Sequence, residues 1–314
     1  MLWAVPSKEY IFLPDKAHPV DPLITVAGAR PEPKGGGVYF VDVIVRKATL
    51  LERLFGGLHK GADLYPASDV VGPGLSDSQE HDEDVAEMQQ SQQTAAVVAF
   101  RALGRKVTLT PNGALVVDLQ DGSPAAAKLA PGDVIVAVDG KPVRTPSDVA
   151  QAMHGAKIGE KLVFTVRRDG AKRVFVLHTV AAAPHSKRAI VGVYLEPHVA
   201  IHLPERVSID ADGVVGPSAG LAFALDLLQK LGRNVDHGNK IAATGEISMN
   251  GTVSPIGGIK QKTFGAREAG VDAFLVPAGQ NARDARKYAD GLRIIPVKNF
   301  QQALHALATL PPAH

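Results

Sequence analysis

Gly216-Pro-Ser-Ala-Gly220 runs directly into an apolar segment, and this junction decides the fold of the second half of the chain. The segment predicts an amphipathic helix from Ala219 to Leu231, closed by Gly232. Ser218 then stands at the N-terminus of that helix, beside free backbone N–H groups and the positive end of the helix dipole. Such amides can position a hydroxyl and bind an oxyanion, so Ser218 is a candidate nucleophile in the loop formed by Gly216, Pro217 and Ala219.

Two other interpretations of Ser218 compete with nucleophilic catalysis. Most serines at the start of a helix serve only as its N-cap. The pentapeptide also fits G-x-S-x-G, the nucleophile elbow of α/β-hydrolases, which requires a later acid and a later loop histidine. The histidines after Ser218 are His237, His305 and His314. His237 follows Ser218 too closely for an acid to come between them as the elbow requires, His305 falls in a predicted helix, and His314 is the last residue. The sequence therefore disfavours the nucleophile elbow.

A serine without a usable histidine needs another base, and a lysine with a depressed pKa can act as one. Gly257-Gly-Ile-Lys-Gln-Lys262 begins a second predicted helix, with Lys260 in its first turn. The helix dipole disfavours a cation there, and shielding from water would weaken protonation of the amine further. We therefore predict Lys260 as the general base. A plain surface lysine is the alternative for Lys260 and the expectation for Lys262.

The composition narrows the possible chemistry. The chain has 314 residues with 34 basic and 32 acidic side chains, which argues against binding of nucleic acid through a basic face. It has no cysteine, which excludes thiol nucleophiles, disulfides and sites built on cysteine ligands. No apolar run approaches the roughly 18 residues needed to span a bilayer. His198 and His202 lack an acid at metal-site spacing, so no metal is expected.

The N-terminal part of the chain alternates turns with few regular segments. Residues 1–75 contain one strong strand candidate, Val38–Val45, followed by a short helical pattern from Thr49 to Leu54. Residues 76–93 are rich in acids and glutamine and lead into an apolar run that ends at Leu103. We predict one helix with a solvated start, since acids near its N-terminus suit the dipole. An acidic ligand site is the alternative for this run.

Residues 106–180 form a β-rich segment. Strands are predicted at 115–117, 134–138, 161–167 and 173–178, and a short helix at Pro146–His154. The segment resembles a bacterial PDZ domain in three motifs, which are Gly122-Ser-Pro-Ala125, Leu129-x-Pro-Gly-Asp-Val-Ile135 and Val138-Asp-Gly-Lys-Pro-Val143.

This resemblance implies a peptide-binding groove. In such domains a peptide C-terminus adds as a strand beside the helix, here Pro146–His154, and backbone amides hold its carboxylate. The amide loop is expected around Leu109–Gly113. The candidate peptide-binding residues are Asn112, Gly113, Ala114, Leu115, Val149 and Met153. A small β domain with a purely structural role is the alternative.

Residues 186–314 alternate predicted strands and helices, which indicates an α/β or α+β domain. The predicted strands are 191–195, 199–203, 240–243, 274–276 and 292–296, and the predicted helices are 219–231, 259–269 and 300–307.

Several ordered motifs in this region resemble the proteolytic domain of the Lon family. They are Gly216-Pro-Ser-Ala-Gly220, Ala243-Thr-Gly-Glu-Ile247, Gly251-x-Val-x-Pro-Ile-Gly-Gly-Ile-Lys-Gln-Lys262 and Ala266-x-x-Ala-Gly270. The resemblance implies a Ser–Lys dyad, carried over to Ser218 as nucleophile and Lys260 as general base, with Thr244 supporting the lysine. Val215 stands where the family usually has Asp, which bears on how the resting site is gated.

A Lon-type ATPase would require G-x-x-x-x-G-K-[ST], and this sequence has no such motif. A PDZ domain joined to a Lon-type domain without an ATPase resembles the PDZ-containing Lon-like proteases of bacteria. That resemblance implies an ATP-independent serine endopeptidase acting on proteins or peptides, with no cofactor. It also implies a homo-oligomer on the extracytoplasmic face of the bacterial cell membrane, held by an N-terminal anchor that this chain lacks. The alternative function is a peptide-binding adaptor whose Lon-like domain is inactive or occluded.

The resemblance also predicts how the chain is divided. Lon-type domains place their serine near the middle, and residues 183–314 supply too few residues before Ser218. We therefore expect an α+β fold in which residues 1–105 complete a Lon-type domain with a mixed sheet and helices. The PDZ domain, residues 106–182, is then inserted before the remainder of the proteolytic domain, residues 183–314.

Overall fold

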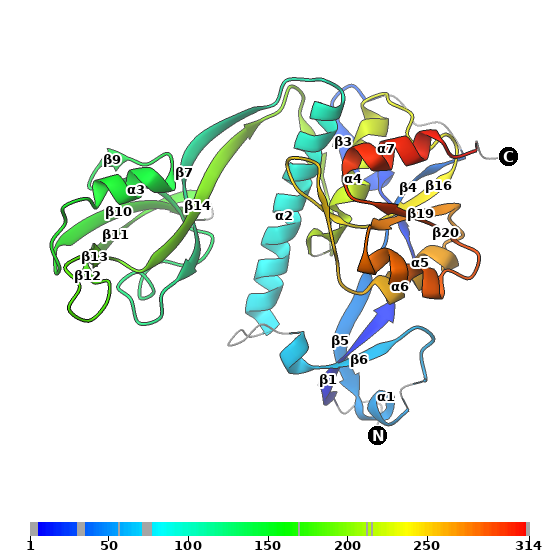
Figure 1. Cartoon of the computed structure of the whole chain (residues 1–314), viewed down its shortest axis with the longest axis horizontal. Coiled ribbons are helices and arrows are strands. Elements are labelled where there is room, and N and C mark those ends of the chain that lie inside the picture. The colour runs from blue at the N-terminus through cyan, green and yellow to red at the C-terminus, as the bar shows by residue number, and fades with distance from the viewer. Residues whose placement is uncertain are drawn as a thin grey trace. The chain divides into compact units, whose positions relative to one another are not determined.

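The computed structural model describes residues 6–29, 35–55, 57–70, 77–168, 170–211, 213–214 and 216–311. The chain forms two compact units (Figure 1). The larger unit consists of two separate stretches, Met1–Val107 and Leu203–His314, and the smaller unit is the stretch between them, Thr108–His202. The smaller unit extends well past residue 182, where the sequence had suggested that it ends.

The larger unit is built around a five-stranded sheet. Four of its strands are parallel and come from two distant regions of the chain, residues 37–40 and residues 240–297. Parallel sheets of this kind are usually covered by helices on both faces. The sheet order is β2 (His18–Pro19), β4 (Gly37–Phe40), β16 (Lys240–Ala243), β19 (Ala273–Pro277) and β20 (Arg293–Val297), with β2 antiparallel to β4. Residues before position 105 therefore supply part of the same sheet as residues after position 239.

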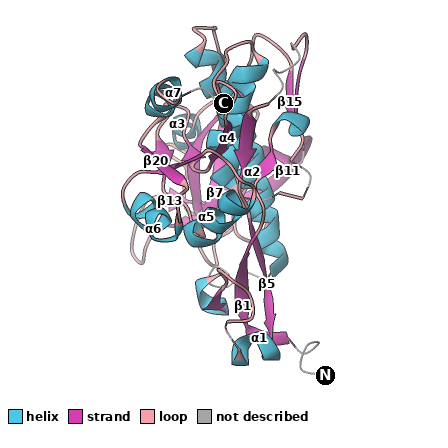
Figure 2. Ribbon diagram, turned by 90° about the vertical axis from the view of Figure 1, so that its right-hand side faces the viewer, coloured by secondary structure: helices cyan, strands magenta, loops and turns pink. Residues whose placement is uncertain are grey.

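A second, three-stranded sheet lies in the larger unit. Its order is β5 (Val43–Thr49), β1 (Pro6–Pro14) and β6 (Asp63–Pro66), all antiparallel. The sequence predicted a single strand over Val38–Val45, and this prediction is wrong. The chain breaks at Val41 and Asp42, so that β4 belongs to one sheet and β5 to the other. Figures 1 and 2 show β1 and β5 side by side, with α1 (Leu50–Leu54) at their end.

Two long helices form the apolar centre of the larger unit. The helix predicted from the acidic, glutamine-rich run is confirmed as α2, Asp77–Ala102, and it packs along α4, Gly220–Lys230. Every residue of α4 except Lys230 is buried, as its nearly continuous apolar sequence requires. The other elements are α5 (Ile259–Glu268), α6 (Gln280–Tyr288), α7 (Phe300–Ala308), the pairs β3 (Ile24–Val26) with β15 (Val207–Ile209) and β17 (Glu246–Ile247) with β18 (Val253–Ser254), and 3₁₀ turns at Asp21–Leu23, Ala67–Asp69 and Pro217–Ala219.

The smaller unit is a β-sheet with one helix. The sheet order is β11 (Ala171–His178), β10 (Lys161–Arg168), β8 (Val134–Val138), β7 (Thr108–Leu119) and β14 (Val193–His202). The helix is α3 (Pro146–Ala152), and the short strands are β9 (Lys141–Pro142), β12 (Val180–Ala181) and β13 (Ala189–Ile190).

Strand β14 differs from its prediction. The sequence suggested two strands separated at Pro197, but β14 is continuous and pairs with β7 from Val193↔Leu119 to His202↔Thr108. A proline is tolerated within a strand when the strand lies at the edge of its sheet, and β14 is such an edge strand. The pairing of Thr108 with His202 also means that the chain enters and leaves the smaller unit at adjacent positions.

Within the part of the chain that the structure describes, no helix combines the length and the apolar character needed to cross a bilayer.

Candidate functional site

Ser218 lies in the 3₁₀ turn Pro217–Ala219, immediately before α4. Helix α2 holds this turn from outside. The N–H of Gly216 donates to the carbonyl of Asp84 at 3.1 Å, and Ser91 Oγ donates to the carbonyl of Pro217 at 3.0 Å. Gly216 has φ +83°, a conformation that side chains other than glycine rarely adopt. The serine loop is therefore fixed by a glycine turn and by α2, a helix that begins 141 positions before Ser218 in the chain.

Thr244 connects the serine loop to the central sheet. It follows β16 directly and is fully buried. Its Oγ1 donates to the carbonyl of Ser218 at 3.2 Å, and the N–H of Gly245 donates to the same carbonyl at 2.8 Å. Two donors on one carbonyl fix the backbone of the serine from the side of the sheet. Thr244 thus lies where the sequence predicted a supporting residue.

Lys262 is the lysine that reaches the serine. Its Nζ lies 2.6 Å from Ser218 Oγ and 3.5 Å from Thr244 Oγ1. The side chain is 4% exposed, and this burial lowers its pKa to about 8, against a smaller opposing attraction from the Asp42 carboxylate. Burial disfavours the charged form of an amine because the protein interior solvates a cation poorly. A substantial fraction of Lys262 is therefore neutral near neutral to mildly alkaline pH.

The prediction that Lys260 pairs with the serine is wrong. Lys260 Nζ donates instead to Asp63 Oδ1 at 2.8 Å and to the carbonyl of Ala62 at 3.3 Å, and it lies 5.7 Å from the ring centroid of Tyr288. Residues two apart on a helix point about 200° away from each other, so Lys260 and Lys262 cannot face the same group. The helix start does lie at Ile259, as expected, but it is the lysine farther into the helix that is buried.

One signal in the sequence identifies Lys262. Ile259, Lys262 and Ala266 follow the i, i+3, i+7 spacing of a buried helix face, and all three are buried. A lysine in an otherwise apolar stripe is a candidate for a lowered pKa, whereas Lys260 falls outside the stripe. Lys260 was predicted because the helix dipole disfavours a cation in the first turn, and the spacing of the buried helix face was not used.

The peptide-binding residues predicted on β7 are not at a free edge. β7 pairs with β14 through Ala114 and Leu115, and the same two residues pair with β8 on the other side. Ala114 is fully buried, and Asn112 Oδ1 lies 2.5 Å from Nδ1 of His198 on β14. A strand that is paired on both sides cannot accept a third. The expected amide loop at Leu109–Gly113 lies within β7, so these predictions are wrong in position.

The sheet of the smaller unit has β11 at one edge and β14 at the other, and α3 lies beside β14. Val193 and Leu195 of β14 and Ala152 and Met153 at the end of α3 are partly buried apolar residues packed on the core of the unit. Of the predicted groove residues, Met153 therefore lies near this edge, while Val149 is buried beneath in the core. These four side chains form an apolar surface, here called the apolar floor, beside the edge of β14 that faces away from β7.

Just before β14, the chain makes a turn that only glycine fits. Gly192 has φ +80°, and a Cβ there would lie 2.3 Å from Cβ of Ser123. Among the described residues, the N–H groups of Val191 and Gly192 find no backbone acceptor, while the carbonyls of both are bound by the N–H groups of Ala125 and Gln120. The turn is thus held in place by hydrogen bonds to its two carbonyl groups.

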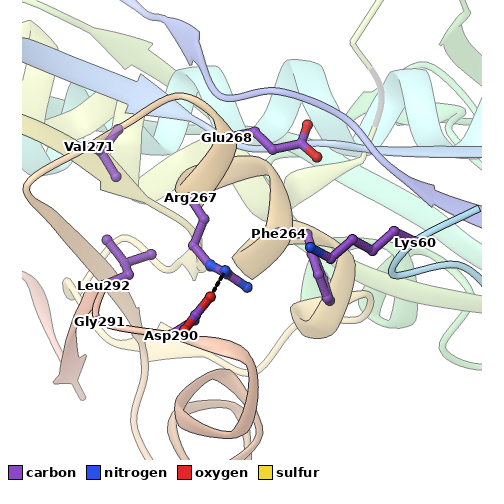
Figure 3. A pocket seen from close by; sticks show the side chains of 8 residues that line it. All are labelled: Lys60, Phe264, Arg267, Glu268, Val271, Asp290, Gly291 and Leu292. Carbon is purple, nitrogen blue, oxygen red and sulfur yellow. Dashed lines mark hydrogen bonds and ion pairs between the residues drawn. The ribbon is translucent and has the colours of Figure 1, made fainter.

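Figure 3 shows a separate cavity of about 430 Å³ on the larger unit. The cavity is lined by Lys60, Phe264, Arg267, Glu268, Val271, Asp290, Gly291 and Leu292. The guanidinium of Arg267 pairs with Asp290 across it. Neither Ser218 nor Lys262 lines this cavity.

Comparison with known families assigns both parts of the chain. Residues 176–309 match the Lon protease (S16) C-terminal proteolytic domain, and residues 101–179 match the PDZ domain. Lon protease 2 of Bacillus subtilis (strain 168) is 38% identical over 112 residues, covering 36% of this chain and 19% of that protein. The mitochondrial Lon protease homolog of Homo sapiens is 35% identical over 133 residues, covering 40% of this chain and 13% of that protein.

Among solved structures, the PDZ domain of an SdrC-like protein from Listeria monocytogenes is 21% identical, with a TM-score of 0.25, and covers 27% of this chain and 87% of that one. The chain spans less than a fifth of the length of the curated relatives described above. By these matches, the chain contains a Lon-type proteolytic domain together with a PDZ domain.

Proposed function

We propose that this chain, in which a Lon-type proteolytic domain is joined to a PDZ domain, is a serine endopeptidase that works through a Ser218–Lys262 dyad without ATP. The observation that carries the proposal is the 2.6 Å contact between Ser218 Oγ and the Nζ of a lysine that is buried and whose pKa is lowered to about 8. Such a lysine can be neutral at working pH and then accepts a proton, as a general base must.

The reaction begins with a proton transfer within the dyad. Neutral Lys262 takes the proton of Ser218 Oγ while that oxygen bonds to the scissile carbonyl carbon, which leaves a tetrahedral oxyanion and a Lys262 ammonium. The Gly220 and Leu221 N–H groups at the start of α4 already donate to the carbonyls of Pro217 and Gly245, so the proposed donor to the oxyanion is the N–H of Ser218 itself. The Lys262 ammonium next protonates the departing amine as the C–N bond breaks, and an acyl-enzyme on Ser218 remains.

Water completes the cycle. Lys262, neutral again, takes a proton from a water molecule that attacks the acyl carbonyl, and the resulting ammonium returns the proton to Ser218 Oγ as the ester bond breaks. Thr244 supports both half-reactions, because its hydroxyl lies between the Ser218 carbonyl and Lys262 Nζ. No step requires a nucleotide or a metal.

Cleavage of an unfolded protein such as casein, without nucleotide, tests the proposal. Wild type should release peptides, and Ser218→Ala should not, while both variants keep the same circular dichroism spectrum. Equal cleavage by wild type and Ser218→Ala would overturn it. The alternative, a peptide-binding adaptor with an inactive proteolytic domain, predicts instead that wild type binds C-terminal peptides and cleaves nothing at any protein concentration.

The PDZ domain is proposed to capture substrate C-termini at the free edge of β14. An extended peptide that adds to Val193–Leu195 would place alternate side chains over the apolar floor formed with α3. Its terminal carboxylate would meet the N–H groups of Val191 and Gly192, which find no backbone acceptor among the described residues.

A binding measurement separates this groove from the rest of the sheet. Leu195→Lys should weaken binding of an apolar C-terminal peptide at least about tenfold, because it places a charge on the floor. Val174→Lys is the matched control, since Val174 is 64% exposed on β11, the far edge of the same sheet. Amidation of the peptide C-terminus should also weaken binding. Equal effects of the two lysine substitutions would argue against the groove.

Assembly and location follow from the resemblance to membrane-anchored Lon-like proteases. We expect a homo-oligomer on the extracytoplasmic face of the bacterial cell membrane. Light scattering measured beside activity over a range of concentrations tests the first expectation, and cell fractionation of the native protein tests the second. A monomer with full specific activity at every concentration would remove the need for assembly.

A further inference from the structure

Asp42 lies at the edge of the five-stranded sheet where two paired parallel strands end, the edge from which the residues near the dyad emerge. Phe40 at the end of β4 pairs with Ala243 at the end of β16. Because parallel strands end at the same edge of a sheet, the residues that follow them emerge together. Thr244, which contacts Lys262, follows β16, and the break that contains Asp42 follows β4.

A second contact fixes Asp42 against the helix that carries Lys262. The neighbouring side chain of Val43 packs on Gly258 at the start of α5, so closely that a Cβ at Gly258 would lie 2.7 Å from Val43 Cγ2. Gly258 also has φ +66°, which independently favours glycine there. The Asp42 carboxylate is partly buried, and its Oδ1 accepts the Val43 N–H at 2.7 Å. Its position is thus set by backbone contacts.

A third segment, residues 15–18, also contributes groups that act on Asp42. The carbonyl of Asp15 packs on Gly265, one turn after Lys262 in α5, where a Cβ would lie only 1.8 Å from that oxygen. The His18 ring pairs with Asp15 at 3.2 Å and stacks on Phe40 at 5.5 Å between centroids. The charged and titratable groups that act on Asp42 are therefore Lys262 from α5, and Asp15 and His18 from this segment.

Among the described residues, Asp42 is the negative group that acts on Lys262. Asp42 is the carboxylate whose attraction favours the charged form of Lys262, against the effect of burial. The Asp42 carboxyl itself has a raised pKa, because burial disfavours its anion and Asp15 repels it, although Lys262 and His18 attract it. The attraction between two partly desolvated charges is screened less by water than the attraction between two surface charges.

We propose that Asp42 is a positioning residue that acts through Lys262: its carboxylate stabilises the ammonium that forms when Lys262 takes the proton of Ser218. The inference rests on the proposed function. A buried carboxylate beside a catalytic histidine stabilises the imidazolium that forms after proton transfer. Asp42 would stabilise the Lys262 ammonium in the same way. It is an attraction through space, since no hydrogen bond joins Asp42 to Lys262 among the described contacts.

The test is the isosteric substitution Asp42→Asn, which removes the charge and keeps an oxygen for the Val43 N–H. The rate of peptide cleavage is measured from about pH 6 to about pH 10. Without the carboxylate, the Lys262 ammonium is less stable, so the acid limb of the profile should move to lower pH. The plateau rate should fall by about fivefold, the size of a weak charge pair at the effective dielectric of a protein. Asp42→Glu should restore much of the wild-type profile.

Asp63→Asn is the matched control, because Asp63 pairs with Lys260 on the other face of α5. It should leave the acid limb in place. A merely structural role for Asp42 would lower the rate without moving the acid limb, and that result would overturn the proposal.

A second measurement does not depend on activity. Titration of the Lys262 side chain by NMR, assigned through loss of its signal in Lys262→Met, should give a lower midpoint in Asp42→Asn than in wild type. If the wild-type chain cleaves nothing, the proposed function fails and this midpoint alone decides about Asp42. An unchanged midpoint refutes the inference whether or not the chain is active.

Discussion

Lys260 and Lys262 are separated by one residue in α5, yet one is bound to Asp63 near the surface and the other is buried against Ser218. The helix therefore offers an internal comparison. Both side chains are lysines, both stand in the first two turns, and their surroundings alone distinguish them.

The first prediction uses this comparison. Lys262→Met should lower the rate of cleavage by about a thousandfold or more, because it removes the base beside the nucleophile. Lys260→Met should keep the rate within about threefold of wild type, since a partly exposed ion pair is worth about 1 kcal/mol or less. Steady-state kinetics on one fluorogenic peptide measure both. A large loss in Lys260→Met with retained activity in Lys262→Met would reverse the assignment.

The pH dependence of cleavage is the second prediction. The active form requires neutral Lys262, whose pKa is lowered to about 8 by burial. The rate should therefore be low at acidic pH, rise through about pH 8 and level off above it. A profile of kcat/KM against pH reports this group in the free enzyme. A midpoint near the ordinary pKa of lysine would mean that the side chain is solvated in solution.

The third prediction is that Lys262→Met is more stable than wild type, although it loses activity. The pKa of Lys262 is lower in the folded chain than in the unfolded chain, so the unfolded chain binds more protons between about pH 8 and the ordinary lysine value, and stability rises with pH there. Below about pH 8 the buried ammonium costs about 3 kcal/mol, from about 1.4 kcal/mol for each unit. Lys262→Met should thus raise the free energy of unfolding at pH 7 by an amount of this order.

Denaturant unfolding at two pH values checks the linkage. The difference between Lys262→Met and wild type should shrink as the pH rises from about 8 toward the ordinary pKa of lysine. Lys260→Met serves as the control, because Lys260 is partly exposed and paired with Asp63. A Lys262→Met variant that is less stable than wild type at pH 7 would contradict the expected penalty.

Thr244 provides the fourth prediction. Thr244→Val keeps the shape of the side chain and removes the hydroxyl that binds the Ser218 carbonyl. The Gly245 N–H still binds that carbonyl, so the fold should persist. The loss of one hydrogen bond should lower kcat by about fivefold to tenfold with little change in KM. Recovery in Thr244→Ser would show that the hydroxyl, rather than the methyl group, matters.

Local sequence patterns placed Ser218 correctly at the start of α4, because the residues that form this junction are neighbours in the chain. A glycine turn, a proline and the apolar start of α4 all lie within a few residues of Ser218. The α+β architecture with a Lon-type and a PDZ domain was likewise accessible, since each motif lies within a short stretch. In these cases the residues that shape the structure are neighbours in the chain.

The lysine and the groove depend on packing between distant segments, which local patterns do not contain. Lys260 is occupied by Asp63, almost 200 positions earlier, while Lys262 is buried by the serine loop and the sheet. The break at Asp42 was missed because the residues on both sides of this single acid in Val38–Val45 are β-branched or aromatic, which favours one continuous strand. The continuity of β14 through Pro197 was not predicted, because the edge position that tolerates a proline depends on pairing with the distant strand β7.

The pairing of Thr108 with His202 makes the PDZ domain a removable cassette. Paired residues in antiparallel strands lie only about 5 Å apart, a gap that a two-residue hairpin turn can bridge. The domain could thus be excised, or exchanged for another recognition module, without cutting any strand of the five-stranded sheet that supports Ser218 and Lys262. Under the proposed function, an insertion with both ends at one point lets the recognition module change while Ser218 and Lys262 stay in place.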